Sequence, residues 1–259
     1  MPVRAALTIA ALALVLVPAA TAGRSSVGIV SVRDLGAGAA EVWVLLPDRP
    51  PTCVVTFVHA AGDATPDNYL PWMNYLALDK KCAVIFPRYE AAAGAPLASE
   101  LRGLRAGVKA GLALVHGSSY GLNKSPASEQ LPMVVAGFGY GATLALHDAA
   151  DAKGWGLPVP GAVDGVFPVA GTAADLPKGS LPSTTRVLVE VGDRDTAGGR
   201  AGGRFVFGYL AAHAAGKKRL IVVHSSARLT ADGKAPFEST PAAEETFWPR
   251  LDGLINTAR

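Results

Sequence analysis

The chain has 259 residues, of which 50% are hydrophobic and 17% charged, and its 24 basic and 21 acidic residues give a formal net charge of +3. This apolar composition excludes an intrinsically disordered protein. The charges are spread along the sequence without a block of one sign, which argues against a nucleic-acid partner or an anionic membrane surface.

The first residues have the pattern of a secretory signal peptide. Arg4 supplies a basic start, residues 5–17 form an apolar run, and small residues follow up to Ala22. We therefore expect a signal peptide over residues 1–22 and a single domain over residues 23–259. The apolar run is shorter than the ~20 residues that a membrane-spanning helix needs, and no later stretch reaches that length. Export is favoured over an uncleaved anchor.

The rest of the chain alternates short apolar runs with segments whose apolar residues recur at helical spacing. Continuous apolar runs of strand length are typical of strands buried on both faces of a parallel sheet. The first two runs flank a turn-like glycine-rich segment and predict an antiparallel hairpin. We expect strands over residues 27–32, 41–46, 52–58, 82–87, 131–136, 162–169, 186–191 and 219–223, and helices over residues 68–78, 97–115, 142–152, 205–215 and 247–255. This alternation predicts one doubly wound α/β domain.

The two cysteines, Cys53 and Cys82, each lie at the start of a predicted strand. In an oxidising compartment two such thiols can form a disulfide. The geometry of neighbouring parallel strands often misplaces the sulfur atoms, and unpaired buried cysteines behave as small hydrophobic residues. The sequence leaves both states open.

The most informative segment is a glycine-rich turn between the predicted strand at 131–136 and the helix at 142–152. It reads Gly-Phe-Gly-Tyr-Gly from residue 137 to residue 141 and has the strand-turn-helix context of a Gly-x-Ser-x-Gly nucleophile elbow. Gly139 stands where such an elbow carries its serine. Glycine adopts strained elbow conformations without a Cβ penalty, so we expect the fold to tolerate the replacement.

With this turn and further landmarks, the chain resembles the α/β-hydrolase superfamily, in particular compact secreted esterase-like or chlorophyllase-like bacterial hydrolases. The resemblance runs from the strand at residue 52 to the last helix. Residues 59–62 (His-Ala-Ala-Gly) resemble the oxyanion loop, residues 191–196 the acid turn, and residues 230–236 the loop that delivers the catalytic histidine. The resemblance implies an α/β-hydrolase fold with a mostly parallel sheet, an N-terminal antiparallel hairpin and little or no lid.

The resemblance also implies a role for individual positions. Asp195 matches the acid that orients the catalytic histidine, whereas Gly139 and Gly233 occupy the nucleophile and histidine positions. The backbone amides of Ala61 and Tyr140 match the oxyanion donors. A serine-hydrolase triad needs a hydroxyl, an imidazole and a carboxylate together. The resemblance therefore implies a hydrolase scaffold without serine-hydrolase activity.

Three further residues, His59, Arg88 and Tyr89, are expected on the rim of the pocket, above the carboxyl ends of the strands where ligands bind in open α/β sheets. For Arg88 and Tyr89, ordinary surface packing is an equal alternative.

Two residues, Ser119 and His224, are candidates for substitute catalytic roles. Ser119 lies in a second Gly-x-Ser-x-Gly match, but that match follows a long amphipathic helix, and His224 follows a predicted strand where an unused histidine is the favoured interpretation.

The same turn also fits a dinucleotide-binding fingerprint, with Gly137, Gly139 and Ala142 at the required spacing. That fingerprint needs an acidic residue at the end of the following strand, whereas Asp164 lies near the start of its strand. The remaining histidines are isolated and indicate no metal site. We therefore expect neither cofactor nor metal.

Three hypotheses remain. The first is a secreted pseudoenzyme that binds a small apolar or ester-like ligand or a protein partner. The second is a residual or rerouted ester hydrolase that uses Ser119 or a water molecule held near Asp195. The third is a purely structural or surface-interaction protein, for which the pocket should be filled.

Overall fold

The computed structural model describes residues 31–90, 94–117, 131–169, 175–176, 179–196 and 198–258. The predicted signal peptide and Ser119 lie outside these residues, as does most of the segment that follows residue 169. Within the described ranges, no helix is long and apolar enough to cross a membrane.

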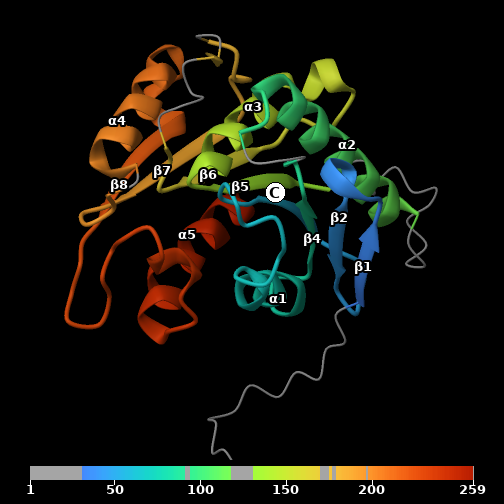
Figure 1. Ribbon diagram of the computed structural model, residues 1–259, viewed down its shortest axis with the longest axis horizontal. Coiled ribbons are helices and arrows are strands. Elements are labelled where there is room, and N and C mark those ends of the chain that lie inside the picture. Colours follow the sequence, from blue (N-terminus) through green and yellow to red (C-terminus); the bar gives the residue numbers. More distant parts are fainter. Residues whose placement is uncertain are drawn as a thin grey trace, which may run out of the picture.

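The strands of the described residues form one eight-stranded sheet in the order β1-β2-β4-β3-β5-β6-β7-β8 (Figure 1). β1 pairs antiparallel with β2, and β2 pairs antiparallel with β4, whereas the remaining neighbours run parallel. The strands are β1 (Ser31–Leu35), β2 (Val42–Leu46), β3 (Cys53–Val58), β4 (Cys82–Pro87), β5 (Met133–Phe138), β6 (Ala162–Val166), β7 (Arg186–Gly192) and β8 (Lys218–Val223). The predicted mostly parallel sheet with an N-terminal antiparallel hairpin is confirmed.

Helices cover both faces of this sheet. Figure 1 shows α2, α3 and α4 on one face and α1 and α5 on the other, and the element contacts agree. The α-helices are α1 (Leu70–Leu78), α2 (Leu97–His116), α3 (Tyr140–Trp155), α4 (Gly199–Tyr209) and α5 (Pro241–Ala258), and the short 3-10 helices are η1 (Gly38–Ala40), η4 (Leu210–Ala212), η5 (Ala215–Lys217) and η6 (Ala235–Phe237). Each face of the sheet thus has its own apolar core.

Several element boundaries differ from the prediction, and those of β1 and α4 have a clear physical reason. The hairpin's first strand is β1 at Ser31–Leu35 rather than residues 27–32, because its register on β2 pairs Ser31 with Leu46 and Leu35 with Val42. The helix predicted over residues 205–215 lies earlier in the chain, since α4 begins at Gly199 and ends at Tyr209. A Cβ at Gly203 would lie 1.9 Å from the Cγ1 atom of Val191 on β7, so glycine here permits close helix-sheet packing.

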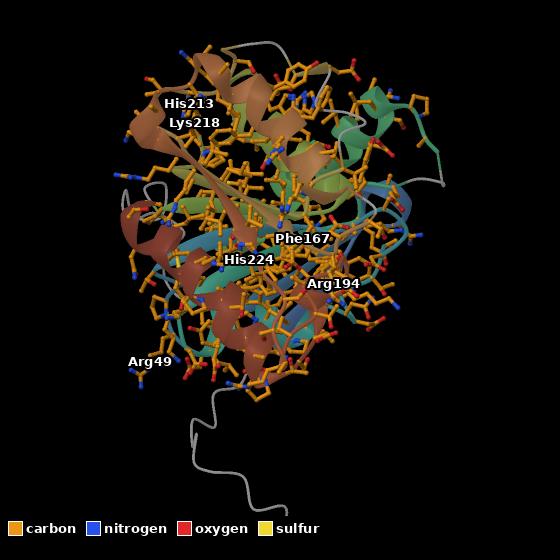
Figure 2. The ribbon with its side chains drawn as sticks, turned by 90° about the vertical axis from the view of Figure 1, so that its left-hand side faces the viewer. Arg49, Phe167, Arg194, His213, Lys218 and His224 are labelled. Atoms are coloured by element: carbon orange, nitrogen blue, oxygen red, sulfur yellow. A yellow bond between two sulfur atoms is a disulfide. The ribbon has the colours of Figure 1, made fainter. Side chains whose placement is uncertain are left out.

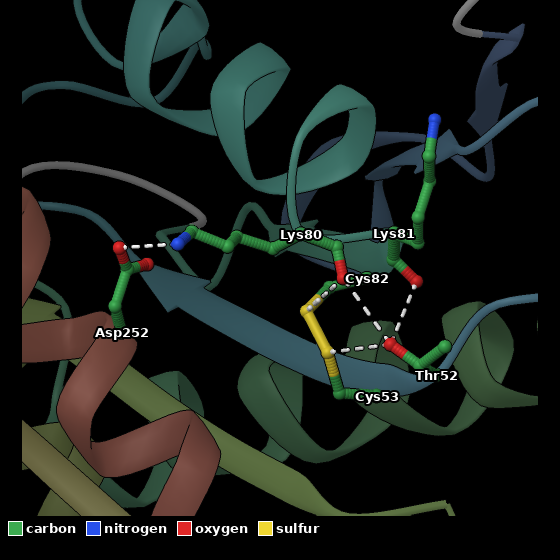
Figure 3. Close-up of a disulfide and its surroundings, with 6 residues drawn as sticks. All are labelled: Thr52, Cys53, Lys80, Lys81, Cys82 and Asp252. Carbon is green, nitrogen blue, oxygen red and sulfur yellow. Dashed lines mark hydrogen bonds and ion pairs between the residues drawn. A yellow bond between two sulfur atoms is a disulfide. The ribbon is translucent and has the colours of Figure 1, made fainter.

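The two cysteines form a disulfide (Figure 3). β3 and β4 pair in a parallel register that places Cys53 directly opposite Cys82, with their Cα atoms 4.6 Å apart. This separation lies within the range that a disulfide spans. Next to it, the hydroxyl of Thr52 donates to the carbonyl oxygen of Lys80 at 3.2 Å. The bond therefore ties the starts of two central strands.

Candidate active site

The glycine-rich turn between β5 and α3 has the geometry of a sharp elbow. Gly139 precedes α3 with φ 53° and ψ −117°, a conformation that residues with a side chain rarely adopt. A Cβ at Gly137 would lie 2.3 Å from the carbonyl oxygen of Gly141, and a Cβ at Gly141 would lie 2.2 Å from that of His59. At Gly139 the nearest atom would be the Cβ of Ala60, at 3.4 Å. The turn thus requires glycine on both sides of residue 139 but leaves space for a side chain at 139 itself.

The end of β6 supports this elbow. The amide of Gly139 donates to the carbonyl oxygen of Val166 at 2.9 Å, and the amide of Val169 donates to that of Gly139 at 3.2 Å. Between them, Phe167 has φ 52° and donates its amide to Glu190 on β7. β6 therefore ends at Val166, three residues earlier than predicted, because the chain turns here to contact the elbow.

The acid position lies directly beside the histidine position. The carboxylate of Asp195 follows β7 and accepts hydrogen bonds from the amides of Gly199 at 2.8 Å and Gly198 at 3.5 Å. The start of α4 thereby orients it. A Cβ at Gly233 would lie 3.5 Å from Oδ1 of Asp195, an ordinary contact distance. A side chain at residue 233 would therefore meet the carboxylate.

These three positions line one cavity of about 340 Å³. Gly139, Asp195 and Gly233 meet there although they come from three separate loops at the carboxyl ends of the strands. The cavity wall is otherwise mainly apolar. It is formed by Ala60, Ala61, Phe138, Tyr140, Val166, Phe167, Val169, Pro236 and Phe237. A second, more polar hollow of about 540 Å³ shares Ala60, Gly233 and Phe237 with it and extends the site toward Asp63 and Lys234.

The two residues whose amides are predicted as oxyanion donors line this cavity from different elements. On either side of Ala61, the amide of Ala60 donates to the Tyr69 hydroxyl at 2.8 Å, and the amide of Gly62 donates to the carboxylate of Glu90 at 3.0 Å. These bonds hold the loop in place. Tyr140 begins α3, where the first amides have no partner within the helix. Among the described residues, the amides of Ala61 and Tyr140 have no hydrogen-bond acceptor, so both are available to a ligand oxygen.

The prediction that His59 and Tyr89 lie on the pocket rim is wrong. Both are fully buried, with their rings stacked at a centroid distance of 4.2 Å. The His59 ring nitrogen Nδ1 lies 2.7 Å from the carbonyl oxygen of Ala60, and burial lowers the pKa of His59 to about 4. Arg88 forms an ion pair with Glu41 at 2.8 Å and lines neither of the two cavities. Aromatic packing under the loop, rather than solvent, surrounds these strand ends.

The structure places the substitute base away from the cavity. His224 follows β8 with its side chain 71% exposed and its Nδ1 atom 3.5 Å from a carboxylate oxygen of Asp193 (Figure 2). Asp193 in turn accepts hydrogen bonds from the amide and hydroxyl of Ser225, and these bonds lower its pKa. His224 does not line the cavity that holds Gly139.

The dinucleotide interpretation also fails on geometry. Asp164 lies inside β6, paired with Ala136 on one side and Leu188 on the other, and is fully buried. Desolvation and the nearby carboxylate of Glu190 raise its pKa well above the usual value. A buried carboxylate in the middle of a strand cannot reach a ribose at the end of the sheet.

The sequence pointed to the polar positions of the site but not to its aromatic wall. Phe138 lies within the elbow itself, whereas Phe167 and Phe237 come from two loops far apart in the chain. The one available signal for Phe237 was its place just after the loop at 230–236. Nothing in the local sequence marked Phe167, because its contact with the cavity depends on the positive φ of the turn after β6.

The sequence matches no protein-family model, and no curated protein shows significant sequence similarity to it. Its structure is similar to that of carboxyl esterase 2 from the mycorrhizal fungus Tuber melanosporum, with a TM-score of 0.65 and 15% identity over 91% of this chain and 89% of the esterase. An esterase from Pyrococcus furiosus gives a TM-score of 0.61 at 14% identity, covering 88% of this chain and 90% of that protein. An α/β hydrolase from a Medee basin deep-sea metagenome library gives 0.61 at 14% identity, covering 88% and 98%. With this topology and these structural relatives, the chain has the α/β-hydrolase fold.

Proposed function

We propose that this protein is an exported α/β-hydrolase-fold pseudoenzyme that binds a small ligand in the cavity at Gly139 and does not perform serine-hydrolase chemistry. The observation that carries the proposal is the convergence of Gly139, Asp195 and Gly233 on one cavity. Among the described residues that line it, none is a serine, threonine, cysteine or histidine. The carboxylate and the amides remain, but the cavity has neither the serine nucleophile nor the histidine base of a serine hydrolase.

The chemistry of the cavity favours a small apolar or ester-like ligand. The amides of Ala61 and Tyr140 can donate to a carbonyl oxygen, and the carboxylate of Asp195 can accept from a hydroxyl or amine. The aromatic and aliphatic wall suits an apolar body between these two ends. A volume of about 340 Å³ lies within the range of small-molecule sites, and an open cavity argues against a purely structural role.

Export is supported by two independent features. The basic and apolar start of the chain has the pattern of a signal peptide. The Cys53–Cys82 disulfide is the kind of bond that persists in oxidising compartments and is rare in the cytosol.

The alternative is a rerouted ester hydrolase in which Asp195 activates a water molecule and the two amides stabilise the developing oxyanion. The open amides beside a carboxylate favour this alternative over one that depends on a displaced histidine. It would hydrolyse esters without a covalent intermediate.

Two measurements separate these functions. We expect the purified protein to show no turnover of short p-nitrophenyl esters and no labelling by a fluorophosphonate probe. Ester turnover that disappears in Asp195→Ala, without labelling, would establish the water-mediated alternative, and a labelled serine would establish a nucleophile elsewhere in the chain. Either result would overturn the pseudoenzyme proposal.

Ligand binding is tested separately from catalysis. Phenyl butyrate, a short neutral ester, is expected to raise the melting temperature of the protein. Ala61→Trp, which puts a large side chain on the cavity wall, should abolish that shift. The matched control is Gly154→Ala on α3, where a Cβ meets no atom within 4 Å, and it should respond to the ester like the parent protein. An equal shift in Ala61→Trp would mean that the ester binds elsewhere.

A further inference from the structure

A separate cavity, away from the candidate active site, lies between β8 and α5, at the side of the molecule that faces the viewer in Figure 2. Its volume is about 430 Å³. Its lining includes Arg186 and Lys218, which are the first residues of β7 and β8, whereas the Gly139 cavity lies beyond the carboxyl ends of the strands. The two cavities share no lining residue. The groove at β8 is therefore separate from the candidate active site.

The groove exists because one part of the sheet lacks a covering helix. α4 packs on one face of β7 and β8, but α5 packs mainly on β5 and β6. The α5-side face of β7 and β8 is thus left as an apolar floor. Leu188 pairs with Arg219, and Glu190 pairs with Ile221, so these side chains share one face. Because Glu190 forms an ion pair with Arg250 of α5, that face is the one toward α5.

The walls of the groove are basic. Arg186 lies two residues before Leu188 and Arg219 is paired with it, so both arginines belong to the α5-side face. No acidic residue is among the described residues that line the groove. Arg250 is engaged by Glu190, whereas Arg186 and Arg219 have no ion-pair partner in the described part of the chain. Two guanidinium groups are therefore free to bind an anion at one end of an apolar floor.

The side of the groove formed by α5 leaves room for a chain-like ligand. Arg250, Gly253, Leu254 and Thr257 line the groove at helical spacing. A Cβ at Gly253 would meet no atom within 4 Å, so the glycine keeps this stretch open. Lys218 is not part of the anion site, because its Nζ atom donates to the carbonyl oxygens of Leu210 and Ala211.

We propose that this groove binds a single-chain amphiphilic anion. The oxyanion head is held by Arg186 and Arg219, whose planar guanidinium groups match phosphate and carboxylate oxygens. The alkyl chain lies on Leu188 and Ile221 against Leu254. This binding is independent of the proposed function at Gly139. The competing explanation is that the basic residues only protect the exposed edge of β8 from pairing with another chain.

The test is isothermal titration calorimetry with decyl phosphate and decanoate below their micelle concentrations, with inorganic phosphate and neutral decyl maltoside as comparisons. We expect one molecule of either alkyl anion to bind per chain. The Kd of the alkyl anion should be at least about tenfold lower than that of decyl maltoside. The double variant Arg186→Gln with Arg219→Gln should weaken binding by at least about tenfold as well.

Two variants localise the ligand. Gly253→Leu should weaken binding because its side chain fills the groove, whereas Gly253→Ala is the matched control and should keep the parent Kd. Ala61→Trp, in the other cavity, should also keep it. The proposal is wrong if decyl maltoside or inorganic phosphate binds as tightly as the alkyl anions, or if Ala61→Trp alone removes binding. It is also wrong if the double arginine variant keeps the parent Kd, or if neither alkyl anion binds. Self-association of that variant without binding would favour edge protection instead.

Discussion

The backbone conformation of Gly139 predicts how its replacement changes the stability of the protein. Gly139→Ser returns a side chain to a position with φ 53° and ψ −117°, where the nearest atom to the new Cβ is at 3.4 Å. The contact is tolerable, so strain in the backbone is the main cost, about 1–3 kcal/mol for such a conformation. Replacing glycine also reduces the entropy of the unfolded chain, which offsets about 0.4–1 kcal/mol. We expect a net loss of about 1–2 kcal/mol in the free energy of unfolding.

Two other glycines, Gly137 and Gly154, give comparisons for the expected loss in the free energy of unfolding. Gly137→Ala would place a Cβ 2.3 Å from a backbone oxygen that cannot move independently, so we expect it to destabilise far more or to prevent folding. Gly154→Ala lies in the last turn of α3 with open space around its Cβ. It should instead stabilise the protein, by up to about 1 kcal/mol.

Urea unfolding followed by circular dichroism measures the free energy of unfolding of all three variants. In a thermal melt, each kcal/mol lost lowers the melting temperature of a domain of this size by roughly 2–4 °C. A Gly139→Ser protein as stable as Gly154→Ala would refute the reasoning, because it would mean that the turn is not held at positive φ. The double variant Gly139→Ser with Gly233→His then tests chemistry, since Asp195 lies 3.5 Å from the Cβ position at residue 233. Ester turnover should appear if the scaffold is still catalytically arranged.

Three further predictions concern stability. Replacing Cys53 and Cys82 with serine should lower the free energy of unfolding by roughly 3–4 kcal/mol for the loop of 29 residues, measured in urea against the oxidised parent. Burial raises the pKa of Asp148 to about 7, so its contribution to stability is fully present below pH 4 and is lost as the pH rises to 7. Asp148→Asn should therefore flatten the decrease in stability between pH 5 and pH 8, and an unchanged slope would contradict the assignment. Gly203→Ala should destabilise the protein by about 1–3 kcal/mol, whereas Gly208→Ala in the same helix should not, and equal thermal melts would contradict the close packing of α4 on the sheet.

The order of strands and helices was readable from the sequence because periodicity reports burial. The continuous apolar runs of β3 and β4 and the helical spacing in α2 correspond to elements close to their predicted bounds. The sequence does not predict the start of α4, because its glycines are poor helix formers and their role depends on the close contact of Gly203 with β7. The cysteine pairing could not be decided in advance because it depends on which residues of β3 and β4 face each other. The burial of His59 and Tyr89 cannot be predicted from the local sequence, because stacking between strand ends is a long-range contact.

The amino-acid sequence alone shows which catalytic side chains the site lacks. Whatever the fold, Gly139 and Gly233 have neither a hydroxyl nor an imidazole, and Asp195 keeps its carboxylate. That these positions share a cavity, and that Ala61 and Tyr140 line it as well, follows from the tertiary structure alone. The physical reason is that parallel strands gather their carboxyl ends at one edge of the sheet, where loops distant in sequence meet. The basic groove likewise depends on where α5 leaves the sheet uncovered, which no local pattern encodes.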